Sequence, residues 1–260
     1  MILETILQRK RDEVAAKRGQ LPLDEIRAQI RDLPPVRDFP GSVASQGRGI
    51  RLIAELKRIS PSAGPLRDFS ASALAGSYEA AGAVALSVLT DAPFFGGNSE
   101  DLADAKDAVR LPVLRKDFVI DAYQIYETRL LGADAVLLIA AALPENVLKD
   151  LVGLTTEVGL CPFVETHTAE EVTAALRTTA RVIGINNRDL RTFRVAIGTT
   201  LNLRHLIPPD RIVVSESGYS CRAEVARVER AGVDAILIGE SLLRAPDVAS
   251  KVRELLGASE

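Results

Sequence analysis

The sequence is poor in the residues that disulfide frameworks and metal sites require. Its 260 residues include only two cysteines, Cys161 and Cys221, and two histidines. Two thiols so far apart form neither a disulfide scaffold nor a cysteine cluster, and the histidines lack metal-ligand spacing. Cys161 opens an apolar run, so we expect a buried thiol. We therefore expect no metal, no cofactor and a reducing compartment, the cytoplasm.

Long hydrophobic runs and an excess of positive charge are also missing. The longest apolar run, residues 135–143, is far shorter than the ~20 residues of a membrane helix. Charged residues such as Arg9 and Lys10 interrupt the segment where a signal peptide would be apolar. A net charge of -3 argues against nonspecific nucleic-acid binding. We predict a cytoplasmic protein without membrane or nucleic-acid partners.

From residue 50 onward, short apolar runs alternate with longer amphipathic segments. Three of the helical segments end at a glycine, which supplies the left-handed turn into the next strand: Gly82, Gly132 and Gly232. Eight such units with apolar strands predict a closed (β/α)8 TIM barrel, and an open doubly wound sheet is the alternative. The predicted strands are residues 51–57, 83–89, 112–118, 135–140, 161–165, 181–186, 211–217 and 235–239, and helices are predicted at 70–81, 121–131, 144–158 and 220–231.

Residues 1–260 are predicted to form a single barrel domain, a length typical of this fold. Residues 1–48 lie outside the repeat and are too few to fold alone, so we expect an N-terminal helical extension packed on the barrel. Apolar residues recur at helical spacing between 2 and 14, and a second helix is predicted at 21–33, before Pro34 and Pro35. The pattern does not decide which end of the barrel the extension covers.

In a TIM barrel, function belongs at the carboxyl ends of the strands. The first strand carries Glu55 and Lys57, whose spacing of two places both side chains on one face. Burying two ions is unfavourable by several kcal/mol unless each is well paired. The pair therefore indicates a polar site, and a structural ion pair that caps the core is the alternative.

Other strands contribute polar residues at the same end. Two lysines near two carboxylates form a coupled set that can donate and accept protons. Taken alone, Lys116 could instead be a solvated strand-end lysine, because Arg115 and Asp117 flank it. The predicted residues on strands three, five, six and seven are Lys116 and Phe118, Glu165, Asn186 and Arg188, and Glu216.

The loops after strands seven and eight contain small residues, Ser217-Gly218 and Gly239-Glu240-Ser241. Small residues let backbone N–H groups approach a phosphate, and barrels commonly bind phosphate at these loops. Simple turn chemistry is the alternative. The loop at 91–98 holds two phenylalanines and two glycines, which predicts a lid or an apolar wall, or else a plug into the core.

His167, two residues after Glu165, is the weaker candidate for a base. It lies past the predicted strand end, where it could instead cap the next helix.

Six ordered motifs make the chain similar to one family. They are IAELKRISPS (53–62), SVLTDAPFFGG (87–97), LRKDFVID (114–121), GINNRDLRTF (184–193), SESGYS (215–220) and ILIGESLL (236–243). In these motifs, and over essentially all of its length, the chain resembles the indole-3-glycerol phosphate synthases. The resemblance implies a carboxyphenylamino deoxyribulose 5-phosphate substrate, which is cyclised, decarboxylated and dehydrated in tryptophan biosynthesis without a cofactor.

The resemblance also implies acid–base roles. Lys116 would protonate the substrate carbonyl oxygen, Glu165 would remove a proton during dehydration, and Lys57 would donate one to the departing hydroxyl. Glu55 would orient the lysines, and Asn186 and Glu216 would hydrogen-bond the substrate or the catalytic groups. The division of acid roles between the two lysines stays open, because coupled groups do not titrate individually.

Binding residues follow from the same resemblance. Ser60 would hold an anionic end of the substrate, and a carboxylate would need a cation such as Arg188 or Lys57. Ser217 would contact the substrate, and the phosphate would be bound by Lys57, Gly218, Gly239, Glu240 and Ser241. Apolar walls for the ring would be Phe95, Phe118, Leu137, Leu190 and Leu237.

Three loop positions depart from the family pattern: Ala63 stands where lysine is common, and Arg194 and Ala196 where acidic residues are common. Two other functions stay open. One is an aldolase-like or pyridoxal-phosphate-synthase-like barrel in which a lysine forms a Schiff base, and the other is a phosphate-binding barrel without catalysis. We expect a monomer, with a weak homodimer as the alternative.

Overall fold

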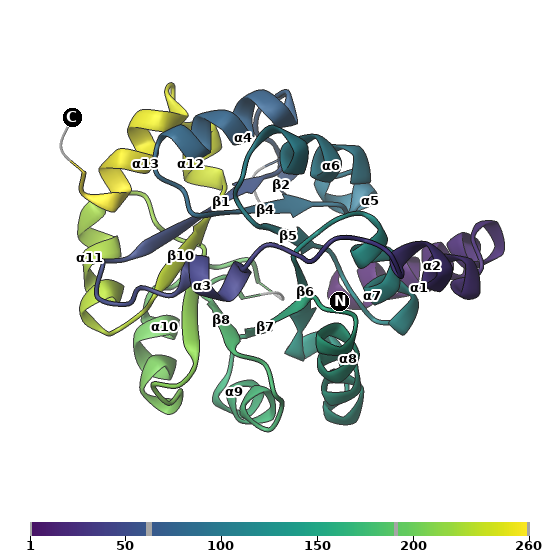
Figure 1. Cartoon of the computed structure of the whole chain (residues 1–260). Coiled ribbons are helices and arrows are strands. Elements are labelled where there is room, and N and C mark those ends of the chain that lie inside the picture. The colour runs from purple at the N-terminus through teal and green to yellow at the C-terminus, as the bar shows by residue number, and fades with distance from the viewer. Residues whose placement is uncertain (1, 61–63, 190–191, 259–260) are drawn as a thin grey trace.

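The computed structural model describes residues 2–60, 64–189 and 192–258. Eight parallel strands form a closed barrel, because β1 pairs with both β4 and β10 (Figure 1). Closure confirms the TIM barrel and excludes the open sheet. The barrel strands are β1 (Arg51–Leu56), β4 (Ala85–Leu89), β5 (Val113–Lys116), β6 (Ala135–Ile139), β7 (Cys161–Thr166), β8 (Val182–Asn186), β9 (Ile212–Glu216) and β10 (Ala235–Ile238).

Helices surround the barrel and connect its strands (Figure 1). Gly82, Gly132 and Gly232 have φ values of 103, 82 and 81°, as the predicted helix-to-strand turns require. A short hairpin, β2 (Ile59–Ser60) with β3 (Gly64–Pro65), follows β1. The helices after β1 are α4 (Ala71–Ala80), α5 (Ala92–Phe95), α6 (Ser99–Ala108), α7 (Ala122–Leu130), α8 (Glu145–Glu157), α9 (Ala169–Leu176), α10 (Gly198–Leu203), α11 (Arg222–Arg230), α12 (Glu240–Arg244) and α13 (Val248–Leu256), with 3-10 turns at Ala140–Ala142 and Arg204–Leu206.

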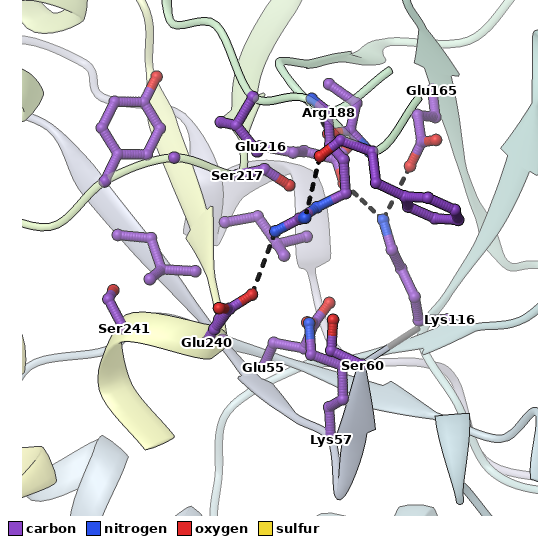
Figure 2. A pocket seen from close by; sticks show the side chains of 18 of the residues that line it. Glu55, Lys57, Ser60, Lys116, Glu165, Arg188, Glu216, Ser217, Glu240 and Ser241 are labelled. Carbon is purple, nitrogen blue, oxygen red and sulfur yellow. Dashed lines mark hydrogen bonds and ion pairs between the residues drawn. The ribbon is translucent and has the colours of Figure 1, made fainter. Parts of the chain in front are cut away.

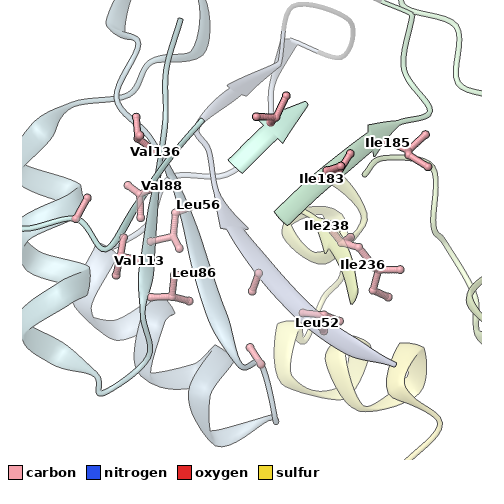
Figure 3. Packing of buried hydrophobic residues seen from close by; sticks show 14 of the residues in the cluster. Leu52, Leu56, Leu86, Val88, Val113, Val136, Ile183, Ile185, Ile236 and Ile238 are labelled. Atoms are coloured by element: carbon pink, nitrogen blue, oxygen red, sulfur yellow. The ribbon is translucent and has the colours of Figure 1, made fainter. Parts of the chain in front are cut away.

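The strands alternate between two apolar layers. Outward-facing residues such as Leu52, Leu86 and Ile236 are fully buried beneath the helices (Figure 3). Inward-facing residues such as Ile53 and Phe163 fill the barrel interior. Because apolar side chains occupy both layers, the polar side chains at the carboxyl ends of the strands are not needed to complete the core.

The N-terminal extension contacts both ends of the barrel. Helix α3 (Phe39–Val43) buries Phe39 against Phe163 inside the barrel, with ring centroids 6.3 Å apart. Helix α1 (Ile2–Gln20) lies at the opposite end, where Lys10 Nζ is 3.0 Å from Asp91 and 2.9 Å from Asp117, in the loops after β4 and β5.

The helices of the extension differ in length from the sequence prediction. Helix α1 continues to Gln20 because Ala15, Ala16 and Lys17 are strong helix formers even without apolar periodicity. Helix α2 (Leu23–Ile30) is shorter than predicted and lies beside α7. Within the described ranges, we find no helix that is both long and apolar enough to span a membrane.

Candidate active site

A cavity of about 720 Å³ opens at the carboxyl ends of the strands. That volume suits a small organic ligand. Every residue predicted for the site lines this cavity except Leu190, which lies outside the described residues. Figure 2 shows Lys116 and Glu165 on one side of the cavity, Glu55, Lys57 and Ser60 on another, and Glu240 and Ser241 away from Lys116.

Lys116, at the end of β5, lies between two carboxylates. Its Nζ is 2.8 Å from Glu165 Oε2 on β7 and 2.5 Å from Glu216 Oε2 on β9 (Figure 2). Burial alone would lower the pKa of Lys116, but the charges of Glu165, Glu216 and Glu55 raise it. The solvated interpretation was wrong, because Arg115 and Asp117 are themselves buried and Lys116 faces the cavity. Lys116 is therefore held as an ammonium.

The two carboxylates beside Lys116 differ in their ionisation. Burial raises the pKa of Glu216 to about 8, since Lys116 only partly offsets it and Glu165 and Glu55 add to the effect. Burial acts on Glu165 too, but Lys116 and His167 hold its pKa below the ordinary range. Environments that separate the pKa values of two neighbouring acids suit them to different roles. Glu165 is the group that remains a carboxylate, ready to accept a proton.

Glu55 and Lys57 form the second charged pair of the cavity. Lys57 Nζ lies 2.5 Å from Glu55 Oε1, and both residues line the cavity. Gly239, after β10, makes this arrangement possible, because a β-carbon there would lie 2.5 Å from Glu55 Oε1. The pair thus faces the cavity, as a purely structural cap of the core would not.

One wall of the cavity is apolar. Asp91 caps the short helix α5, which ends at Phe95, and the Phe95 and Phe118 rings lie 6.0 Å apart, tilted by 37°. Leu137 and Leu237 complete this wall from inside the barrel. The loop at 91–98 therefore supplies an apolar wall of the cavity, which was one of the predictions for this loop.

The loops after β9 and β10 form the far side of the cavity. Ser217 and Gly218 both have positive φ, 67 and 96°, and line the cavity with Gly239 and Ser241. The hydroxyl oxygen of Ser241 is buried and has no hydrogen-bond partner among the described residues. A buried oxygen without a partner is unfavourable, and a polar ligand in the cavity would satisfy it.

Arg188 and Glu240 bridge the loops at the mouth of the cavity. Arg188 Nη2 lies 3.2 Å from Glu240 Oε2, and Arg244 Nε lies 3.3 Å from Glu240 Oε1. Each carboxylate oxygen of Glu240 is thus paired with a guanidinium group. Of the three departures from the family pattern, Arg194 and Ala196 lie in the loop after β8, and Ala63 falls outside the described residues.

His167 lies behind Glu165 and does not line the cavity. Its Nε2 is 3.4 Å from Glu165 Oε1, and its Nδ1 is 3.2 Å from Glu171 Oε2. The helix cap is Thr168, whose side chain accepts from Glu171 N, so the capping interpretation of His167 was wrong. His167 acts on the site through Glu165.

Sequence reasoning missed two buried residues next to the site. Lys10, 1% exposed, supports the loops after β4 and β5, and its spacing of four from Ile6 and Val14, both buried on α1, was the available signal. Asn187, 2% exposed, lies between two predicted residues but points away from the cavity, into a hydrogen-bonded cluster. Cys161 is buried and unpaired, as predicted.

A barrel that gathers lysines, carboxylates and small-residue loops at the carboxyl ends of its strands has the architecture of a TIM-barrel enzyme. Residues 3–255 match the family model for indole-3-glycerol phosphate synthase. The chain belongs to this family.

Two relatives carry that family's name. An indole-3-glycerol phosphate synthase from Dehalococcoides mccartyi is 46% identical, and the match covers 98% of this chain and 100% of the relative. One from Rhodopirellula baltica is 45% identical over 99% of each. Among solved structures, a 3-hexulose-6-phosphate synthase from Salmonella typhimurium shares the fold, with a TM-score of 0.65 and 14% identity over 80% of this chain and 97% of that chain.

Proposed function

We propose that the protein converts 1-(2-carboxyphenylamino)-1-deoxyribulose 5-phosphate into indole-3-glycerol phosphate, carbon dioxide and water. Family membership makes the chain a carboxy-lyase of tryptophan biosynthesis. The observation that carries the mechanism is Lys116, an ammonium held between Glu165 and Glu216 at the cavity surface. Such a group is charged and positioned to donate a proton.

The dimensions and chemistry of the cavity support this substrate. The phosphate binds at Gly218, Gly239 and Ser241, with Glu240 and Lys57 assisting, where the Ser241 hydroxyl has no partner within the described part of the chain. Arg188 or Lys57 pairs with the substrate carboxylate. Ser60 holds an anionic end, Ser217 contacts the substrate, and the aromatic ring packs on the Phe95–Phe118 wall, with Leu137, Leu190 and Leu237.

Ring closure is the first step. The ring carbon that bears the carboxylate attacks the ketone carbon, and the carbonyl oxygen takes a proton from Lys116 Nζ. The new carbon–carbon bond leaves an iminium on the substrate. The bond to the carboxylate then breaks, carbon dioxide leaves, and the electron pair left behind neutralises the iminium.

Dehydration completes the ring. Glu165 removes a proton from carbon, and the hydroxyl leaves as water with a proton from Lys57. Glu55, 2.5 Å from Lys57, orients that lysine. Asn186 and Glu216 hydrogen-bond substrate hydroxyls or the catalytic groups. The assignment of the first acid step to Lys116 and the second to Lys57 is part of the proposal.

The test is to add the carboxyphenylamino deoxyribulose phosphate to the folded protein and follow indole fluorescence. The chain has no tryptophan, so the product signal rises over a tyrosine background alone. Appearance of product at a rate proportional to protein concentration is expected. Folded protein that yields no product would overturn the proposal.

The Schiff-base alternative requires a free amine on a lysine. The raised pKa of Lys116 argues against a Schiff base at that residue, since its glutamate neighbours, Glu165 first among them, outweigh burial and stabilise the ammonium. Borohydride treatment with substrate, followed by mass spectrometry, distinguishes the two, because only the Schiff-base mechanism leaves a covalent adduct. We further propose that the protein works in the cytoplasm as a monomer.

A further inference from the structure

Asn187 lies directly after β8, between the cavity residues Asn186 and Arg188, but its side chain points to the other side of the chain. It is 2% exposed. Its Nδ2 donates to Ser217 O at 3.0 Å and to Ser215 Oγ at 3.1 Å. Its Oδ1 accepts from Thr200 N at 3.1 Å and from Thr200 Oγ1 at 2.9 Å. The amide thus joins the ends of β8 and β9 to the first turns of α10.

The backbone N–H of Thr200 fixes which way this amide is oriented, because it can only donate to Oδ1, and a chain of hydroxyl groups fits the same orientation. Tyr219 OH and Ser215 Oγ are 2.5 Å apart, as are Ser215 Oγ and Thr200 Oγ1. All of these groups are satisfied when Tyr219 donates to Ser215, Ser215 to Thr200, and Thr200 to Asn187 Oδ1. With its oxygen so occupied, Asn187 can present only its N–H groups to the carbonyl of Ser217.

That carbonyl belongs to a residue in an unfavourable backbone conformation. Ser217 has φ of 67°, a left-handed value that is unfavourable for a non-glycine residue. Such conformations persist only where surrounding contacts enforce them. The Asn187 bond is one such contact, and Val195 is another, since it packs so closely on Gly218 that a β-carbon there would lie 2.5 Å from Val195 Cγ1.

We infer that Asn187 is a positioning residue that holds the Ser217–Gly218 loop in the conformation that receives a phosphate monoester. The inference rests on the proposed function, which puts the substrate phosphate at this loop. Asn187 does not line the cavity, so it acts through the Ser217 backbone. Because its amide is neutral and donates, an acidic residue of the same shape would repel the Ser217 carbonyl and the phosphate.

The test is Asn187→Asp, which keeps the shape and removes the donor. Inorganic phosphate binding, measured by calorimetry, is expected to weaken about tenfold or more, equivalent to about 1.4 kcal/mol. KM for the substrate is expected to rise by the same factor while kcat stays within about threefold. Asn202→Asp, at an exposed position on α10, is the matched control, because it makes the same substitution away from the Ser217 carbonyl. It should change phosphate affinity far less.

A folded Asn187→Asp protein with unchanged phosphate affinity would overturn the inference. If that variant does not fold, Asn187→Ala removes the donor to Ser217 without adding a charge, and the same loss of phosphate affinity is expected. A rescue experiment tests the inference independently. In an Asn187→Ala background, Ser217→Gly removes the cost of the left-handed backbone conformation, and the double variant should recover part of the phosphate affinity. No recovery counts against positioning. Phosphate binding needs no turnover, so this result is separate from a failure of the proposed reaction.

Discussion

Lys10 Nζ lies 2.9 Å from Asp117 Oδ1, and this contact closes a ring of alternating charges between helix α1 and the end of β5. Asp117 pairs with Arg115 at 3.1 Å, and Arg115 pairs with Glu127 at 2.8 Å. The ring returns through Lys17 and Glu13 to Lys10, with contacts of 2.8, 3.1 and 2.8 Å. Lys116, the last residue of β5, lies between two members of the ring in sequence, Arg115 and Asp117.

Lys10→Met should destabilise the protein strongly. It leaves Asp91 and Asp117, each 2% exposed or less, without their ammonium partner. Breaking a buried ion pair by removing one member costs about 3–5 kcal/mol. Urea unfolding measures the change, and Arg9→Ala on the exposed face of the same helix is the control. Equal stability of the two variants would mean that the ring contributes nothing to folding.

Lys116→Met should abolish turnover without unfolding the protein. General acid catalysis contributes about 10²–10⁴-fold to a rate, so kcat should fall by at least the lower figure. Glu165 and Glu216 lose their shared cation, so the pKa of Glu165 is expected to rise. Circular dichroism checks the fold, and Lys149→Met, at an exposed position on α8, controls for loss of a lysine. Near-full activity in Lys116→Met would remove Lys116 from its proposed role.

His167→Gln should shift the pH dependence of kcat. Burial opposes the charge of His167, but Glu171 and Glu165 raise its pKa, so its charge helps to keep Glu165 ionised. The groups that face it are Glu165, Glu171 and, further away, Glu216. Without the imidazolium the pKa of Glu165 rises, and a base with a higher pKa is lost at higher pH. The acid limb of the profile should therefore move to higher pH, and an unmoved limb would separate His167 from catalysis.

Gly239→Ala should reduce activity by displacing Glu55, because the added β-carbon would lie 2.5 Å from Glu55 Oε1. The displaced carboxylate no longer orients Lys57. We therefore expect kcat to fall even when the variant remains fully folded. Gly76→Ala is the matched control, since a β-carbon in the interior of α4 meets nothing within 4 Å. That change should stabilise the protein by about 0.5–1 kcal/mol. Comparable kinetics for both variants would contradict the steric argument.

The barrel and its cavity could be predicted because both follow from periodicity. Side chains that alternate between the two faces of a strand place Glu55 and Lys57 on one face, and parallel strands bring Lys116 and Glu165 to the same end. The contacts of Asn187 and Lys10 could not be predicted in this way. Their partners come from segments distant in sequence, such as Thr200 for one and Asp117 for the other, and no local pattern encodes such pairings.

The role of His167 could be predicted only in part. Its position two residues after Glu165 predicts that the two side chains lie near each other. That spacing does not distinguish an imidazole behind the Glu165 carboxylate from one that caps the next helix. The choice depends on the hydroxyl of Thr168, which takes the cap position and leaves His167 to the Glu171 carboxylate. Competition between neighbouring capping residues is decided by geometry that the sequence does not contain.

The closure of the barrel also orders events during folding. Strand β1 pairs with β10, and α3 inserts Phe39 against Phe163 and contacts β9. During synthesis, β1 finds its neighbour β4 early, but its second neighbour β10 and the Phe163 and β9 partners of α3 exist only much later. Contacts of such large sequence separation form slowly. The apolar face of α3 is consequently the segment that a nascent chain exposes longest and that a chaperone would have most time to bind.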